Sequence, residues 1–92
     1  MKAIFLLRVE KSRVLTGLGV LLLPAAPPEI LAALDLHTNL PVQLVYPDKQ
    51  EFSATASVEE VARAGEPAVR ALLLTQQGAT AVPAGTEVWA SE

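Results

Sequence analysis

Several residue types that carry chemistry are rare or absent in this chain. There is no cysteine, and one histidine, one tryptophan and one tyrosine occur among 92 residues. The lack of cysteine excludes disulfide bonds, thiolate metal sites and a cysteine nucleophile, and it suits a reducing compartment. We therefore expect a cytoplasmic protein.

Long apolar runs are also lacking, and none approaches the roughly 18 residues that cross a membrane as a helix. We expect no membrane contact. An alternative is a secretory signal peptide, with residues 1–13 as its basic region, Val14–Leu23 as its apolar region and Pro24–Ala26 as its cleavage site. Glu10 within the basic region and the glycines within the apolar region argue against it.

Positive charge is scarce beyond the first thirteen residues. Four basic residues and one acidic residue give those thirteen a charge of +3, so with a net charge of −3 the remaining chain carries −6. Such an acidic body disfavours nucleic acid, whose phosphates bind clustered lysine and arginine. The only candidate anion-binding residues are Arg8, Lys11 and Arg13, which also suit the solvated face of an edge strand.

What the chain does have is enough apolar sequence for one small core. The hydrophobic share is 51% and the charged share is 18%. A chain of this length buries only about 60–65% of its unfolded surface. We expect a single domain over residues 1–92.

Short extended segments separated by turn residues dominate the chain. Residues 2–10 alternate, with Ala3, Phe5, Leu7 and Val9 on the inner face and Ile4, Leu6, Arg8 and Glu10 on the outer one. A second extended element, residues 13–23, is broken at Gly17 and Gly19, where the chain turns back. The later extended segments are residues 42–46, 51–59, 68–75 and 86–90. Pro24–Pro28 ends the second segment, and Glu29–Leu34 predicts one or two helical turns.

The segment after Glu51 allows two interpretations. Phe52, Ala54, Ala56 and Val58 alternate with polar residues, which predicts a strand paired with residues 42–46 through the turn Pro47–Gln50. Ser57–Glu60 also fits a capping box that would open a helix ending at Gly65. Because the alternation is uninterrupted to Glu59, we favour the strand. Six short strands and one small helix predict an all-β fold, a closed or nearly closed six-stranded barrel.

Val9–Lys11 followed by Val14–Leu21 resembles the start of the second domain of translational GTPases such as elongation factor Tu. In that domain a strand leads through an apolar step and a Gly-Arg-Gly corner into a valine-rich strand. Val42–Leu44, Ala71–Leu74 and Val82–Val88 are similar to its later strands. The resemblance implies a β-barrel used for docking.

Two departures limit what the resemblance implies. Leu18 stands where the family has the corner arginine, so the guanidinium suited to phosphate or ribose is missing and tRNA binding is not implied. The chain has no Gly-x-x-x-x-Gly-Lys-Ser/Thr loop, so GTP hydrolysis is not implied either.

No catalytic or metal-binding constellation is found in the sequence. His37 has no second histidine, cysteine or paired carboxylate nearby to make a metal site or activate a nucleophile. Glu59 and Glu60 are adjacent and point to opposite faces of a strand, so they do not form an acid and base pair. We expect no catalytic residue, cofactor or metal.

The sequence therefore favours a non-catalytic module that docks a protein partner. The candidate contact residues are Arg8, Lys11, Arg13, Leu18 and Trp89, the last being either a core residue or an interface aromatic at the barrel rim. Alternatives are an RNA- or ribosome-associated factor using the basic N-terminal strand, and a small ligand-binding barrel. A homodimer through Leu21–Leu23 and Leu72–Leu74 is a further alternative.

Overall fold

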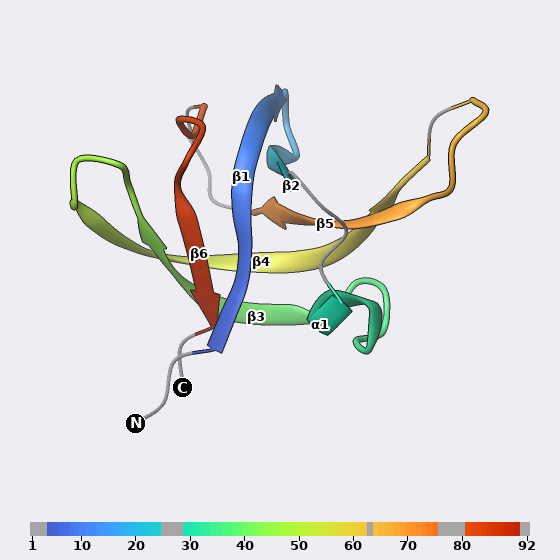
Figure 1. Cartoon of the computed structure of the whole chain (residues 1–92), viewed down its shortest axis with the longest axis horizontal. Helices are drawn as coiled ribbons and strands as arrows, with labels where there is room; N and C mark the ends of the chain where they lie inside the picture. Colours follow the sequence, from blue (N-terminus) through green and yellow to red (C-terminus); the bar gives the residue numbers. More distant parts are fainter. Residues whose placement is uncertain (1–3, 25–28, 63, 76–80, 91–92) are drawn as a thin grey trace.

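The computed structural model describes residues 4–24, 29–62, 64–75 and 81–90. It shows the predicted closed barrel of six antiparallel strands with one short helix (Figure 1). The strands are β1 (Ile4–Leu15), β2 (Gly19–Pro24), β3 (Asn39–Val45), β4 (Glu51–Val61), β5 (Val69–Leu74) and β6 (Glu87–Ala90), and the helix is α1 (Glu29–Ala32). Around the barrel the order is β1-β2-β5-β4-β3-β6, with β6 returning to β1.

The interior of the barrel is filled by aliphatic side chains. Those at most 1% exposed are Val9, Val20, Leu22, Leu31, Val42, Ala56, Val58, Leu72 and Val88. Nearly all come from strands, and Leu31 comes from α1, which contacts β5. Close packing of these side chains in the small interior supplies most of the stability that a chain of this size can gain from burial.

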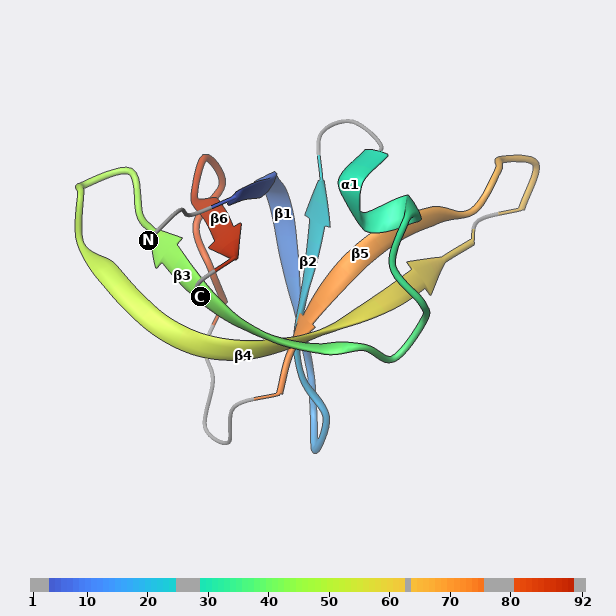
Figure 2. The ribbon, with the colours of Figure 1, turned by 90° about the horizontal axis from the view of Figure 1, so that it is seen from below.

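The chain turns back at Gly17 and Gly19, as predicted, but residues 13–15 belong to the first strand and not to the second. β1 continues to Leu15, and β2 begins at Gly19 directly opposite Leu15. Gly17 and Gly19 have φ of 82° and 136°, a region that residues with a Cβ rarely adopt. The tip of this hairpin projects from the end of the barrel away from α1 (Figure 2).

The predicted inner face of the first strand is wrong at Phe5 and Leu6. In the pairing with β6, Phe5 lies opposite Trp89 and Leu7 opposite Val88, so Leu6 is an extra residue in a bulge. Leu6 and Leu7 are both buried, whereas Phe5 is 42% exposed on the outside. A bulge shifts the period of two by one residue, which exchanges the faces on one side of it.

The other elements agree with the sequence apart from their ends. The hairpin of β3 and β4 turns at Pro47–Gln50, where Lys49 has a φ of 76° and Tyr46 N–H donates to Gln50 O. β3 begins earlier than expected, at Asn39, and β4 runs to Val61, so the alternative helix from Ser57 is wrong. α1 ends two residues earlier than predicted. The expected positions of Ala3 and Ala25–Pro28 lie outside the described residues.

The second half of β1 lies beside the segment that precedes β6. Val9 N–H donates to Thr86 O, and Gly85 N–H donates to Val9 O, both at 2.8 Å. Further along, the Ser12 hydroxyl donates to Val82 O and accepts from Val82 N–H, again at 2.8 Å. One side chain thus satisfies both backbone groups of a residue that is only 4% exposed.

Replacing Ser12 by alanine is expected to lower the free energy of unfolding by about 1–3 kcal/mol, because the buried polar groups of Val82 lose their partner. Urea unfolding followed by circular dichroism measures this change. Ser53→Ala is the control, since Ser53 is exposed and its hydroxyl donates to the exposed Gln43 side chain; it is expected to stay within about 0.5 kcal/mol of the parent. Equal effects of the two substitutions would contradict this role of Ser12.

Candidate functional site

The three basic residues of β1 lie on the outer face of the barrel, as predicted for a solvated strand face. Arg8, Lys11 and Arg13 are all exposed. The Arg8 guanidinium forms an ion pair with Glu87 at 2.8 Å. Among the described residues, Lys11 and Arg13 take part in no ion pair. One of these three positive charges is therefore neutralised by β6.

Leu18 and Trp89 lie in different parts of the barrel. Leu18 is at the tip of the hairpin of β1 and β2 and is 64% exposed. Trp89 lies on β6, where its neighbour Val88 points into the core and Trp89 itself points outward. The structure therefore does not bring Leu18 and Trp89 into one patch.

Trp89 is the centre of an ordered outer surface. The Phe5 ring meets it edge-on, with ring centroids 5.3 Å apart and an interplanar angle of 72°. The indole Nε1–H donates to Glu87 Oε1 at 3.2 Å, and the other oxygen of Glu87 accepts from Arg8. Trp89 is half-buried by these neighbours, so the ring is held in place while part of it stays accessible.

The surface continues across two more strands. In register, Trp89 lies opposite Gln43 of β3, and Gln43 lies opposite Ser53 of β4. The Ser53 hydroxyl donates to the Gln43 side-chain oxygen at 2.9 Å, and the Gln43 amide donates to Glu51 at 3.3 Å. We call this surface the aromatic face, made up of Phe5, Arg8, Gln43, Ser53, Glu87 and Trp89.

Sequence reasoning identified Arg8 and Trp89 but missed Phe5, which it placed inside. It also missed Gln43 and Ser53. The bulge at Leu6 moves Phe5 outward, and no residue type in this segment signals that bulge. The outward position of Gln43 follows from the alternation of β3, so that signal was present.

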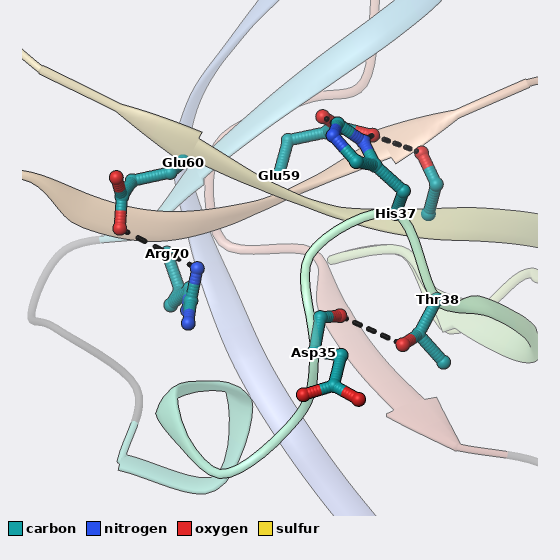
Figure 3. Close-up of polar contacts among 7 residues, drawn as sticks. Asp35, His37, Thr38, Glu59, Glu60 and Arg70 are labelled. Atoms are coloured by element: carbon teal, nitrogen blue, oxygen red, sulfur yellow. Dashed lines mark hydrogen bonds and ion pairs between the residues drawn. The ribbon is translucent and has the colours of Figure 1, made fainter.

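His37 does have a carboxylate partner, contrary to the expectation from the sequence. His37 has a φ of 68° at the end of the loop before β3, and its Nδ1 lies 3.1 Å from Glu59 of β4. The hydroxyl of Ser57 donates to Glu59 at 2.8 Å. Figure 3 shows Glu59 meeting His37 while Glu60 points toward Arg70, which confirms that the adjacent carboxylates diverge.

This cluster lacks the geometry of a nucleophilic triad. In a triad the imidazole stands between the hydroxyl and the carboxylate, so that it takes the hydroxyl proton. Here the carboxylate of Glu59 stands between Ser57 and His37. Thr38 hydroxyl donates to Asp35 O at 2.7 Å, and Val58 forms backbone bonds with both His37 and Thr38. The contacts hold the loop against β4.

The remaining candidates for ligand binding are few. In the ranges that the structure describes, no three side chains of the metal-ligating types come together.

Of the six leucines predicted as a dimer face, Leu22, Leu23, Leu72 and Leu74 are buried, and Leu21 and Leu73 are half-buried on the outside. The described part of the chain contains no helix long and apolar enough to cross a membrane.

Comparisons of the chain with protein-family models, with curated proteins and with solved structures give no match.

Proposed function

We propose that this chain is a non-catalytic binding module that docks a protein partner through the aromatic face. The observation that carries the proposal is the Phe5 and Trp89 pair on the outside of the barrel, fixed by Glu87 and Arg8. Tryptophan and arginine are enriched among residues that dominate binding energy at protein interfaces. An aromatic pair already held in one geometry also loses little side-chain entropy on binding.

The surroundings of the pair suit a protein surface. Gln43 and Ser53 supply amide and hydroxyl groups beside the rings, and Glu51 and Glu87 supply negative charge. A central apolar anchor within a polar rim is the usual arrangement of a transient interface. The filled interior leaves the exterior of the barrel for contact. We also propose a relationship to the docking barrel of translational GTPases, which agrees with this use.

Replacing Trp89 by alanine is expected to weaken partner binding by about 2 kcal/mol or more, roughly 30-fold in affinity, because a buried interface tryptophan is lost. Partners captured from extract by the whole chain would be purified and titrated calorimetrically against each variant. Phe5→Ala is expected to act in the same direction.

The matched control is Phe52→Ala, which removes a ring of similar exposure, 44% against 42% for Phe5, outside the aromatic face. Its partner affinity is expected to stay within about threefold of the parent. If Trp89→Ala and Phe52→Ala bind a purified partner equally well, the aromatic face is not the docking surface.

RNA binding is the competing function, and the shared outward position of Arg8, Lys11 and Arg13 favours it. We expect reversal of all three charges to leave the affinity for a purified protein partner within about tenfold, since two of the three lie outside the aromatic face. Filter binding of total RNA at two salt concentrations tests the alternative. Salt-sensitive RNA binding that the triple reversal abolishes would replace the protein-docking proposal.

A further inference from the structure

The hairpin of β1 and β2 carries an exposed apolar tip, residues 14–18. Its turn is closed by Leu18 N–H, which donates to Leu15 O at 2.9 Å, and Gly17 supplies the positive φ that the turn needs. Leu18 is 64% exposed, more than any other large apolar residue in the described ranges, and Val14 is 49% exposed. The tip projects from the barrel on the side away from α1 (Figure 2). A leucine is thus held in solvent by a turn whose backbone is bonded.

The charged residues nearest the tip along its two strands are both basic. Arg13 and Lys11 are exposed on the outer face of β1, where they pair with Leu21 and Leu23 of β2. At about 3.3 Å per residue, Arg13 lies about 10 Å and Lys11 about 17 Å behind the turn. Neither forms an ion pair with another described residue. The apolar tip is therefore backed by two cationic groups.

The negative charge of the chain lies elsewhere. No acidic residue occurs between Glu10 and Glu29 or between Glu66 and Glu87. These two stretches contain the tip, β2, and β5, which pairs with β2 beside the tip. Glu10 itself lies on β1, farther from the tip than Lys11. The tip is therefore the part of this acidic chain that an anionic surface approaches with the least repulsion.

We propose that the tip inserts into the surface of an anionic membrane, with Leu18 below the headgroups and Arg13 and Lys11 at the lipid phosphates. Apolar side chains at a membrane interface are buried by about 5–10 Å, which matches the spacing between Leu18 and Arg13 along the hairpin. Long basic side chains keep their charge with the headgroups while their stems cover apolar surface. A convex tip needs a matching concavity on a protein, whereas a fluid bilayer adapts to it, so the shape and the charge together favour a lipid surface.

The lack of a long apolar run is compatible with such a contact. A helix that spans a membrane needs roughly 18 apolar residues, whereas a segment that lies in the interface needs only exposed apolar groups beside basic ones. The inference goes beyond the proposed function, because the two surfaces lie toward opposite ends of β1. Phe5 precedes Leu15 by about 30 Å along the strand. A barrel bound through its tip would present the aromatic face to a protein partner away from the bilayer.

The first test measures co-sedimentation of the whole chain with large unilamellar vesicles. We expect binding to phosphatidylcholine vesicles that contain about 30% phosphatidylserine, weakening as salt rises, and at least about tenfold weaker binding to phosphatidylcholine alone. Arg13→Gln is expected to weaken the binding about fivefold. Lys49→Gln removes the same charge from the turn of β3 and β4 and is expected to change it less than about twofold. No binding, or equal binding to the two kinds of vesicle, would overturn the proposal.

The second test removes the apolar contact. Leu18→Ala is expected to weaken binding to the anionic vesicles about tenfold, because less apolar surface leaves water. Leu36→Ala is the matched control, since it makes the same substitution at a leucine that is 40% exposed between α1 and β3. It is expected to change the binding less than about twofold. Equal losses for the two variants would mean that the tip is not the membrane contact.

The third test reports the position of the tip. Because the chain has no cysteine, Thr16→Cys introduces a single thiol on the exposed turn for a nitrobenzoxadiazole fluorophore. On anionic vesicles we expect its emission to shift to the blue and to be quenched by lipids brominated in the upper acyl chain. The same fluorophore on Leu36→Cys is expected to show neither change. Unchanged emission from position 16 on vesicles that bind the chain would overturn the proposal.

The inference and the proposed function fail separately. Trp89→Ala is expected to leave vesicle binding unchanged, and Leu18→Ala is expected to leave the affinity for a purified protein partner within about twofold. If the chain binds no vesicle and the partner binds Leu18→Ala at least tenfold more weakly, the tip is a protein contact and the membrane proposal is wrong. If vesicle binding depends on Leu18 while Trp89→Ala binds the partner with full affinity, the membrane contact stands and the aromatic face is not the docking surface.

Discussion

Gly19→Ala is expected to destabilise the barrel by more than about 3 kcal/mol, enough to unfold much of a small domain. A Cβ at this position would overlap the carbonyl oxygen of Leu74, a backbone atom of the neighbouring strand. Gly19 also has a φ of 136°, which strains any residue with a side chain. Because β2 meets β5 from Val20 onward, the overlap would push apart two strands that close the barrel.

Gly17→Ala is the matched control for this substitution. Gly17 lies two residues away in the same turn and has a positive φ of 82°, but no atom lies within 4 Å of a Cβ built there. We expect it to cost only about 1–2 kcal/mol, the cost of left-handed backbone for alanine. Thermal and urea unfolding of both variants distinguishes the cost of the close approach to Leu74 from the cost of the strained backbone. Equal destabilisation would mean that the contact with Leu74 is unimportant.

Leu72→Ala is expected to lower the free energy of unfolding by about 2–5 kcal/mol, because a fully buried leucine leaves a cavity. Leu72 is 0% exposed and lies on β5 between Leu22 of β2 and Val58 of β4, both also at 0%. Its neighbours are fixed in two ladders, so the cavity cannot collapse without breaking strand pairing. Urea unfolding followed by Trp89 fluorescence and by far-ultraviolet circular dichroism measures the loss.

Leu18→Ala removes the same atoms from the tip of the hairpin, where Leu18 is 64% exposed. It is expected to change the stability by less than about 0.5 kcal/mol. Comparable losses for Leu18→Ala and Leu72→Ala would mean that the interior of the barrel is not the source of its stability.

The hairpin of β3 and β4 shows what the sequence can predict. Phe52–Glu59 alternates without a break, and Pro47 and Asp48 mark the turn, so local pattern and tertiary structure agree there. The Asp48 carboxylate accepts from Gln50 N–H at 3.0 Å, a contact typical of turn aspartates. Closure also followed from local signals, since six apolar strands of this length need partners on both edges.

The structure of β1 shows where such prediction ends. Residues 4–7 are all apolar, so the period of two has no polar residue to mark the faces, and the bulge at Leu6 decides which of them point inward. The end of this strand was also missed, since the prediction ended it at Glu10 and began a second extended segment at Arg13, whereas β1 continues to Leu15. In the barrel Ser12 instead bonds Val82, 70 residues away, which no local pattern reveals.

Some features of the candidate site follow from the local sequence pattern, and others depend on contacts between residues far apart in the chain. Trp89 points outward because its neighbour Val88 points into the core, but its contact with Phe5 depends on the bulge, which turns Phe5 outward. The partner of His37 was missed because Glu59 lies 22 residues further along the chain.

The pairing of Ile4 with Ala90 has a practical consequence. The chain enters and leaves the barrel on adjacent strands, so a short linker could join residues 4 and 90 and new termini could be opened at the exposed Pro47–Gln50 turn. Because the two ends of the barrel are adjacent, the domain could also be inserted into a surface loop of a host enzyme. Such a fusion would present Trp89 beside the point of insertion.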